Sequence, residues 1–177
     1  MWHLGYAHSG NSRGERRPNE VTYYGFPISK DPYAIQVSRM DAHGGWIASP
    51  TDLLRFLVRV DRFVTVPDIL LDSSMRTMFT TTTAKDEKGK PTHYAKGWNI
   101  ADPYETYKTI HNYWHLGRLP GTAALFSRTH DEFCWAVLMN SLNSTSEDTA
   151  NTMINDLDAL MRKIVADTIF WPLSSPL

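Results

Sequence analysis

The chain has 177 residues, enough for one ordinary domain or a large piece of one. Hydrophobic residues make up 42% and charged residues 21% of it, as in globular proteins, so a core can form without a disulfide or a metal staple. The formal net charge of −1 gives no electrostatic reason to expect nucleic acid or an anionic membrane as a partner.

The sequence contains no anchoring or export signal that can be recognised. No run approaches the roughly 20 apolar residues of a membrane span. The first residues lack the basic and apolar regions of a signal peptide. We therefore expect no membrane span, and the location stays open between the periplasm, the outside and the cytoplasm of a bacterium.

The only cysteine, Cys134, excludes an internal disulfide. It lies in the apolar run 133–139, where a buried and inert thiol is expected. We predict no cofactor and no metal.

The first half of the chain reads as an irregular lead-in followed by helices. Frequent glycine and proline predict extended loop over residues 1–40, with at most one short strand at 20–24. Residues 41–93 form a helical segment. Ser49, Pro50 and Asp52 are typical of a capped helix start, and apolar spacing continues to about Asp61. A second helix is predicted from Ser73 to Phe79, before a polar turn.

The second half changes to strands, at 94–100, about 108–116, 122–128 and 133–140. Their short connections predict antiparallel hairpins, and the apolar run 133–139 favours a central strand covered on both faces. Segment 144–168 holds a long helix from about Glu147 to Asp167, whose apolar stripe predicts packing on the sheet. The fold class is therefore α+β, in a single partial domain spanning 1–177.

Three stretches resemble the serine β-lactamase and penicillin-binding-protein-like family, which includes class C β-lactamases, D-aminopeptidases and related esterases. They are residues 41–57 (DAHGGWIASPTDLLRFL), 94–98 (YAKGW) and 115–121 (HLGRLPG). The first is similar to the family's glycine pair before a capped helix, and the second to its Tyr-x-x-Gly-Trp strand. The third resembles the third active-site motif, Lys-Thr-Gly or His-x-Gly. In order and spacing the likeness covers about residues 41–165.

The resemblance implies an antiparallel sheet with flanking helices, of which this chain holds the C-terminal part. It also implies that the parent enzyme hydrolyses a small-molecule amide or ester through an acyl-serine. His115 would then lie at the edge of the site, orienting substrate or assisting proton transfer. The backbone N–H of Arg118 would be an oxyanion donor. Gly117 and Trp98 would line the substrate cleft.

The acylating residues of that family are missing from the chain. The family's serine nucleophile is followed three positions later by lysine, and no serine here is. The nearest pattern, Thr82 with Lys85, falls at the edge of a polar loop. No tyrosine matches the second motif, Tyr-x-Asn or Tyr-x-Ser. We therefore expect the chain to be inactive by itself.

Other motifs match in sequence but lack the structural context that their function needs. Residues 10–14 (GNSRG) match a nucleophile elbow, but without the strand and helix that this motif needs, and Ser9 with Asn11 is a coincidental second motif. His111 and His115 on one strand are roughly 13 Å apart, too far for one zinc ion. Asn143 begins a glycosylation sequon in form only.

Two functions remain open at this point. One is the C-terminal fragment of a serine hydrolase, which would self-associate through the surface left by the missing half. The alternative is a complete, non-catalytic binding module that uses the remnant cleft around His115 and Trp98.

Overall fold

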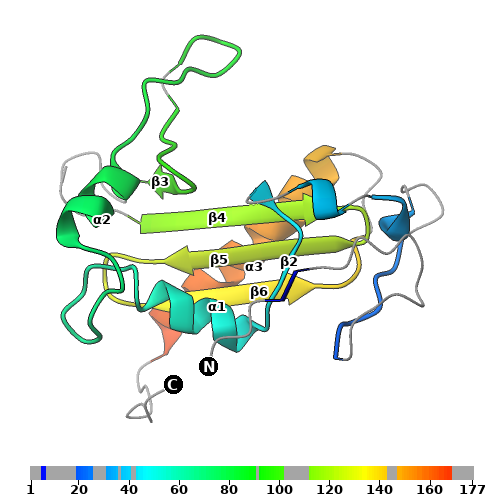
Figure 1. Cartoon of the computed structure of the whole chain (residues 1–177), viewed down its shortest axis with the longest axis horizontal. Coiled ribbons are helices and arrows are strands. Elements are labelled where there is room, and N and C mark those ends of the chain that lie inside the picture. The colour runs from blue at the N-terminus through cyan, green and yellow to red at the C-terminus, as the bar shows by residue number, and fades with distance from the viewer. Residues whose placement is uncertain are drawn as a thin grey trace. The chain divides into compact units, whose positions relative to one another are not determined.

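The computed structural model describes residues 5–6, 19–25, 31–35, 37–40, 43–90, 92–101, 112–142 and 147–168. Its elements in chain order are β1 (Gly5–Tyr6), η2 (Pro32–Ala34), η3 (Val37–Arg39), β2 (Trp46–Ile47), α1 (Pro50–Leu57), α2 (Asp72–Phe79), β3 (Asn99–Ala101), β4 (Asn112–Leu119), β5 (Thr122–Arg128), β6 (Cys134–Met139) and α3 (Glu147–Asp167). Four strands form an antiparallel sheet in the order β3-β4-β5-β6, and β1 pairs separately with β2 (Figure 1). The predicted α+β class is confirmed.

The residue contacts divide the chain into two compact units. One comprises Met1–Asp52, Leu116–Leu125 and Val137–Leu177, and the other comprises Leu53–His115 and Phe126–Ala136. Strands β4, β5 and β6 each contribute residues to both units.

Helix α1 begins as its capping residues predict. The Ser49 hydroxyl accepts a hydrogen bond from the Asp52 N–H at 3.2 Å, and the Asp52 carboxylate accepts from the Ser49 N–H at 3.1 Å. This reciprocal pair satisfies donors that the first helical turn leaves open. The helix ends at Leu57, four residues before the predicted end, because the N–H groups of Arg59 and Val60 turn to carbonyls three residues back.

The core of the second unit gathers around α2 and the strand that follows it. Its buried members are Leu57, Val60, Met75, Ala95, Trp98, Ile100 and Tyr113. The α2 residue Met75 is fully buried, and its helix runs from Asp72, one residue before the predicted start. Removing these side chains from water is the main favourable contribution to folding of this unit.

A buried arginine joins the loop after α1 to strand β5 within the same unit. The Arg128 guanidinium lies 4.0 Å from the ring centroid of Phe63 and 4.9 Å from that of Tyr113. Its NH2 group donates to the Asp61 carbonyl oxygen. The Asp61 carboxylate accepts from the Phe63 N–H at 2.8 Å, and burial raises the pKa of this carboxyl. The loop start is thus held by a desolvated charge between two rings.

Strand β5 has the predicted bounds, and β6 is one residue shorter at each end than predicted. The Thr129 N–H donates to the Phe133 carbonyl at 2.8 Å and closes the predicted hairpin. The prediction that 133–139 is a central strand is wrong, because β6 is the last strand in the order of the described sheet. Trp135 is buried while Leu138 is 37% exposed, so an apolar run did not require cover on both faces.

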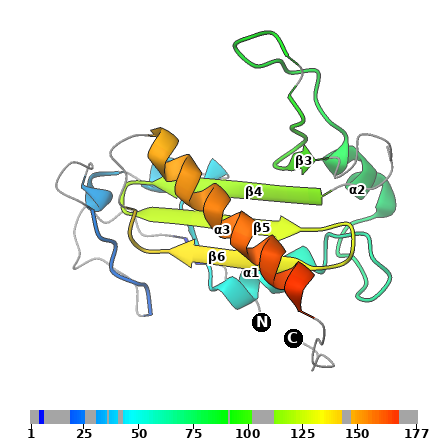
Figure 2. The same ribbon diagram turned by 180° about the vertical axis from the view of Figure 1, so that it is seen from behind.

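Helix α3 has the predicted bounds, Glu147–Asp167. In the first unit it lies across one face of the strand residues that belong to that unit (Figure 2). Ile154 is buried to 1% exposure, as expected for the apolar stripe of a helix packed on a sheet. The packing predicted from the sequence is therefore confirmed.

Two predicted strands are largely replaced by other structure. Tyr24 forms only a parallel bridge to Ser141, with its N–H donating to the Asn140 carbonyl at 2.9 Å, instead of a strand over 20–24. The strand predicted at 94–100 is regular only from Asn99, because a tight turn precedes it. The first residues of the strand predicted at 108–116 lie outside the described residues.

Within the described ranges, no helix is both long enough and apolar enough to cross a membrane.

Two leucines of the second unit give a matched test of this core. Leu57 is 1% exposed and Leu71 is 76% exposed. We expect Leu57→Ala to lower the free energy of unfolding by about 2–5 kcal/mol, since it removes buried atoms and leaves a cavity. Leu71→Ala should change it by less than about 0.5 kcal/mol. Urea unfolding measures both, and equal losses would contradict this core.

Candidate functional site

The Tyr94–Trp98 segment forms a tight turn that fixes the direction of Tyr94. The Ala95 N–H donates to the Trp98 carbonyl at 2.8 Å, and Tyr94 bridges to Asn99 in antiparallel fashion. Gly97 has φ +85°, a left-handed conformation that glycine adopts without steric cost. On the other side, the Tyr94 carbonyl accepts from the Thr82 N–H at 2.9 Å. The backbone of Tyr94 is therefore fixed on both sides.

His115 lies on β4, next to the residues that pair with β3, and is half-buried. Its Nε2 lies 3.0 Å from the Tyr94 hydroxyl oxygen, a hydrogen-bond distance. The two rings meet edge to face at a centroid distance of 6.0 Å. On β5, Phe126 stacks on the His115 ring at 6.3 Å and an angle of 25°. The Tyr94 hydroxyl and the rings of Tyr94 and Phe126 thus help to hold the imidazole.

Trp98 is 4% exposed and belongs to the core. Its ring meets Phe126 at 5.3 Å and Phe79 at 5.5 Å. Packing therefore accounts for this tryptophan, and its predicted part in lining a substrate cleft remains a prediction.

Gly117 and Arg118 follow His115 on β4 and are partly exposed. Gly117 shares a face of the strand with His115, and the Arg118 side chain points to the other face. A Cβ added at Gly117 would meet only the Ala124 Cβ, at an ordinary contact distance of 3.7 Å. Packing therefore does not require glycine here. The oxyanion role of the Arg118 N–H remains a prediction.

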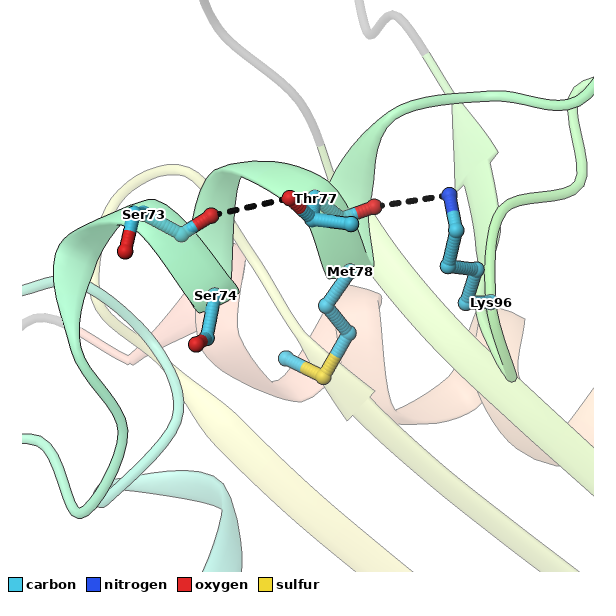
Figure 3. A pocket seen from close by; sticks show the side chains of 5 residues that line it. All are labelled: Ser73, Ser74, Thr77, Met78 and Lys96. Atoms are coloured by element: carbon cyan, nitrogen blue, oxygen red, sulfur yellow. Dashed lines mark hydrogen bonds between the residues drawn. The ribbon is translucent and has the colours of Figure 1, made fainter.

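The second unit also has an open pocket of about 450 Å³ beside α2. Its lining residues are Ser73, Ser74, Thr77, Met78 and Lys96 (Figure 3). The Lys96 ammonium donates to the Thr77 carbonyl at 2.9 Å, and the Thr77 hydroxyl donates to the Ser73 carbonyl at 2.9 Å. Lys96 thereby binds a carbonyl near the end of the helix, where a cation is favoured, instead of activating a serine.

Sequence reasoning missed these two groupings. It used Tyr94 only as a motif residue and gave no role to its hydroxyl, which contacts a side chain 21 positions away. The Ser-x-x-Lys spacing does not apply to Lys96, because a turn and not a helix brings this lysine next to α2. The motif Tyr-x-x-Gly-Trp was the one signal that pointed to the tyrosine.

The remaining candidate nucleophiles have other contacts. The Thr82 hydroxyl donates to the Tyr94 carbonyl at 3.1 Å, and Thr82 and Lys85 lie outside any helix, the conformation that brings side chains three apart together. Burial raises the pKa of the Cys134 thiol to about 12.

Several sequence candidates lie outside the described residues: Ser9 to Gly14, His111 and Asn143. In the part of the chain that the structure describes, no three His, Cys, Asp or Glu side chains gather as a metal site would require.

Comparison with known proteins adds the family. The β-lactamase family model matches residues 2–159, which is most of the chain, so this chain belongs to the β-lactamase family. No curated protein matches it. The resemblance inferred from the three sequence stretches is confirmed.

Substitution of Gly121 and of Gly117, both in the first unit, tests at which position the fold requires glycine. Gly121 has φ +74°, and a Cβ there would lie 2.5 Å from the Pro32 Cγ. We expect Gly121→Ala to lower the free energy of unfolding by about 1–3 kcal/mol through strain and overlap. Gly117→Ala should cost less than about 1 kcal/mol. Denaturant unfolding compares them, and an equal or larger loss at Gly117 would show that packing requires that glycine.

The partly buried thiol of Cys134 gives a second test. At pH 8 a pKa of about 12 leaves almost no thiolate on Cys134, so a thiol reagent should react only slowly with the folded chain. In guanidinium chloride the same thiol should react at the rate of an exposed cysteine. Complete labelling of the folded chain at that denatured rate would contradict the raised pKa and the partial burial of Cys134.

Proposed function

We propose that this chain forms the third-motif wall of a site that binds an amide or ester carbonyl, and that it does not acylate the substrate by itself. Membership of the β-lactamase family supports the class of substrate. The observation that carries the proposal is the His115 ring, held by Tyr94 and Phe126 at the third-motif position.

A held imidazole suits a binding wall, because a group fixed before substrate arrives loses little entropy on binding. Gly117 supports the same role. It lies two residues further along the strand, on the same face as His115. The space around it would admit a Cβ, so packing does not explain why this residue is glycine. A glycine at such a position lets another backbone or a ligand approach closely.

The absence of acylation follows from the residues that the chain has. None of its serines is followed three positions later by lysine, and the Thr82 hydroxyl is bonded to a carbonyl. Acyl transfer would need a serine and a base supplied from outside these 177 residues, in a fragment of a serine hydrolase. A non-catalytic binding module is the second candidate. It is favoured by the Tyr94–His115 pair, which is complete within the chain.

The first experiment asks whether the purified chain acylates. It is incubated with an activated ester and with a chromogenic β-lactam, and its intact mass is measured after treatment with a fluorophosphonate. We expect neither turnover nor a mass adduct. Turnover with one adduct would contradict the proposal, and peptide mapping would show whether Ser73, Ser74 or another serine carries it. Ser73→Ala and Ser74→Ala are the matched controls.

The second part asks whether the wall binds. A phenyl ester or a β-lactam is titrated into the ¹⁵N-labelled chain while the amide signals are followed. We expect shifts centred on His115 and Gly117, and at least about tenfold weaker binding in His115→Gln, as for the loss of one good polar contact. Shifts centred elsewhere, or equal binding by the variant, would exclude the site. If neither ligand shifts a signal, the binding role is wrong.

A further inference from the structure

Lys96 is held beside α2 by both its backbone and its side chain. Its N–H donates to the Met78 carbonyl at 3.1 Å, and its ammonium donates to the Thr77 carbonyl at 2.9 Å. The same Thr77 carbonyl accepts from the Thr80 N–H at 3.4 Å, where the helix ends. The ammonium therefore has a fixed place at the last turn of α2 before any ligand arrives. A group fixed in this way loses little entropy on binding.

The bond to Thr77 leaves donors of the ammonium available to a ligand. An ammonium has three N–H donors and no acceptor, and one of the three is used here. The exposed Lys96 side chain forms part of the wall of the pocket beside α2, whose volume of about 450 Å³ is within the range of small-molecule sites. In the view of Figure 3, Met78 lies between Lys96 and Ser74. The pocket thus has a polar group on either side of a thioether.

The charge of the pocket favours an anion. Of the described residues that line it, Lys96 is the one with a charged side chain. Asp72, the acidic residue in the first turn of α2, is paired with Arg76 at 2.6 Å and with Arg62 at 3.3 Å, so two cations offset its charge. A carboxylate beside an ammonium accepts a charge-assisted hydrogen bond, which is stronger than a neutral one. A ligand with one negative charge would balance the one cation of the wall.

The rest of the wall suits a short apolar group with a polar border. Met78 is half-buried and packs against the core cluster of the second unit, so its side chain offers a supported apolar surface. Ser74 lies one helical turn before Met78, and residues four apart share a helix face. The hydroxyls of Ser73 and Ser74 have no hydrogen-bond partner among the described residues. They can therefore donate to a ligand or hold water at its edge.

We propose that this pocket is a second binding site, which takes a small carboxylate with a short alkyl chain. Lys96 donates to the carboxylate, Met78 contacts the alkyl chain, and Ser74 borders the site. Neither His115 nor Gly117 lines this pocket, so the site is independent of the proposed function. One charged contact and a short chain on an open surface give weak binding, with a dissociation constant on the order of 10 mM.

The test is a titration of sodium butyrate into the ¹⁵N-labelled chain at constant ionic strength, with the amide signals followed. We expect shifts centred on Ser74, Thr77, Met78 and Lys96. Acetate should bind at least about threefold more weakly, because it lacks two methylenes that can contact Met78. Butylamine has an alkyl chain and the opposite charge, and it should not shift these signals.

Lys96→Gln removes the charge and keeps an amide N–H that can donate to the Thr77 carbonyl. It should weaken butyrate binding at least about tenfold. Lys85→Gln is the matched control, because Lys85 is an exposed lysine that does not line the pocket, and it should bind butyrate as the natural chain does.

Equal binding of butyrate by Lys96→Gln would overturn the proposal, and so would shifts centred on other residues such as His115. The absence of any shift at ten times the expected dissociation constant would overturn it as well. Equal affinity for acetate would remove the role of Met78 and with it the alkyl chain of the ligand. If Lys96→Gln does not fold, the natural chain decides: the pocket must respond to butyrate and not to butylamine, and an equal response to both overturns the proposal.

Discussion

The packing around Trp98 is the constraint on which the second unit depends. The indole meets Phe79 of α2, Phe126 of β5 and Tyr113 of β4, so one helix and two strands share a single apolar centre. Trp98 also closes the turn that begins after Tyr94. Burial of the large rings around Trp98 therefore fixes where the Tyr94 hydroxyl and the His115 imidazole meet. The geometry of this polar pair depends on the apolar packing beside it.

This dependence separates two roles within one short motif. In residues 94–98 the tryptophan fills the core, the glycine permits the turn, and the lysine binds the Thr77 carbonyl of α2. Only Tyr94 directs a polar group toward β4. A motif that marks a family in sequence is therefore mostly scaffold here, and its tyrosine hydroxyl contacts His115.

Local sequence patterns predicted the elements that show a clear helical stripe, a strand alternation or a capping pair. The bounds of α3 and β5 follow from an apolar stripe and from alternation, and α1 starts where its capping pair predicts. The end of α1 and the start of β3 could not be predicted, because each depends on which carbonyl accepts the backbone hydrogen bonds of the adjoining turn. His115 was found through its motif, but its bond to Tyr94 was not, because that contact joins residues 21 positions apart through the tertiary fold. The apolar run of β6 led to a wrong prediction, because hydrophobicity alone does not show whether one or both faces of a strand are covered by other elements.

The buried Arg128 has a consequence for how the loop after α1 opens. From Asp61 to Phe63 this loop is held to the guanidinium, whereas Val64, Ile69 and Leu71 beyond it are largely exposed. Freeing the first part would leave a desolvated charge without its carbonyl and ring, which is costly. The second part is held by hydrogen bonds that lie at the surface, at Thr65, Pro67 and Asp68. The Phe63 amide hydrogen is bonded to the Asp61 carboxylate in a partly buried contact, so it should exchange with solvent only when the core itself opens. The Arg62 amide hydrogen is bonded to the exposed Asp68 carboxylate and should exchange through local fluctuations. One short connection thus combines a buried anchor at Asp61 and Phe63 with a surface part that is held by exposed hydrogen bonds.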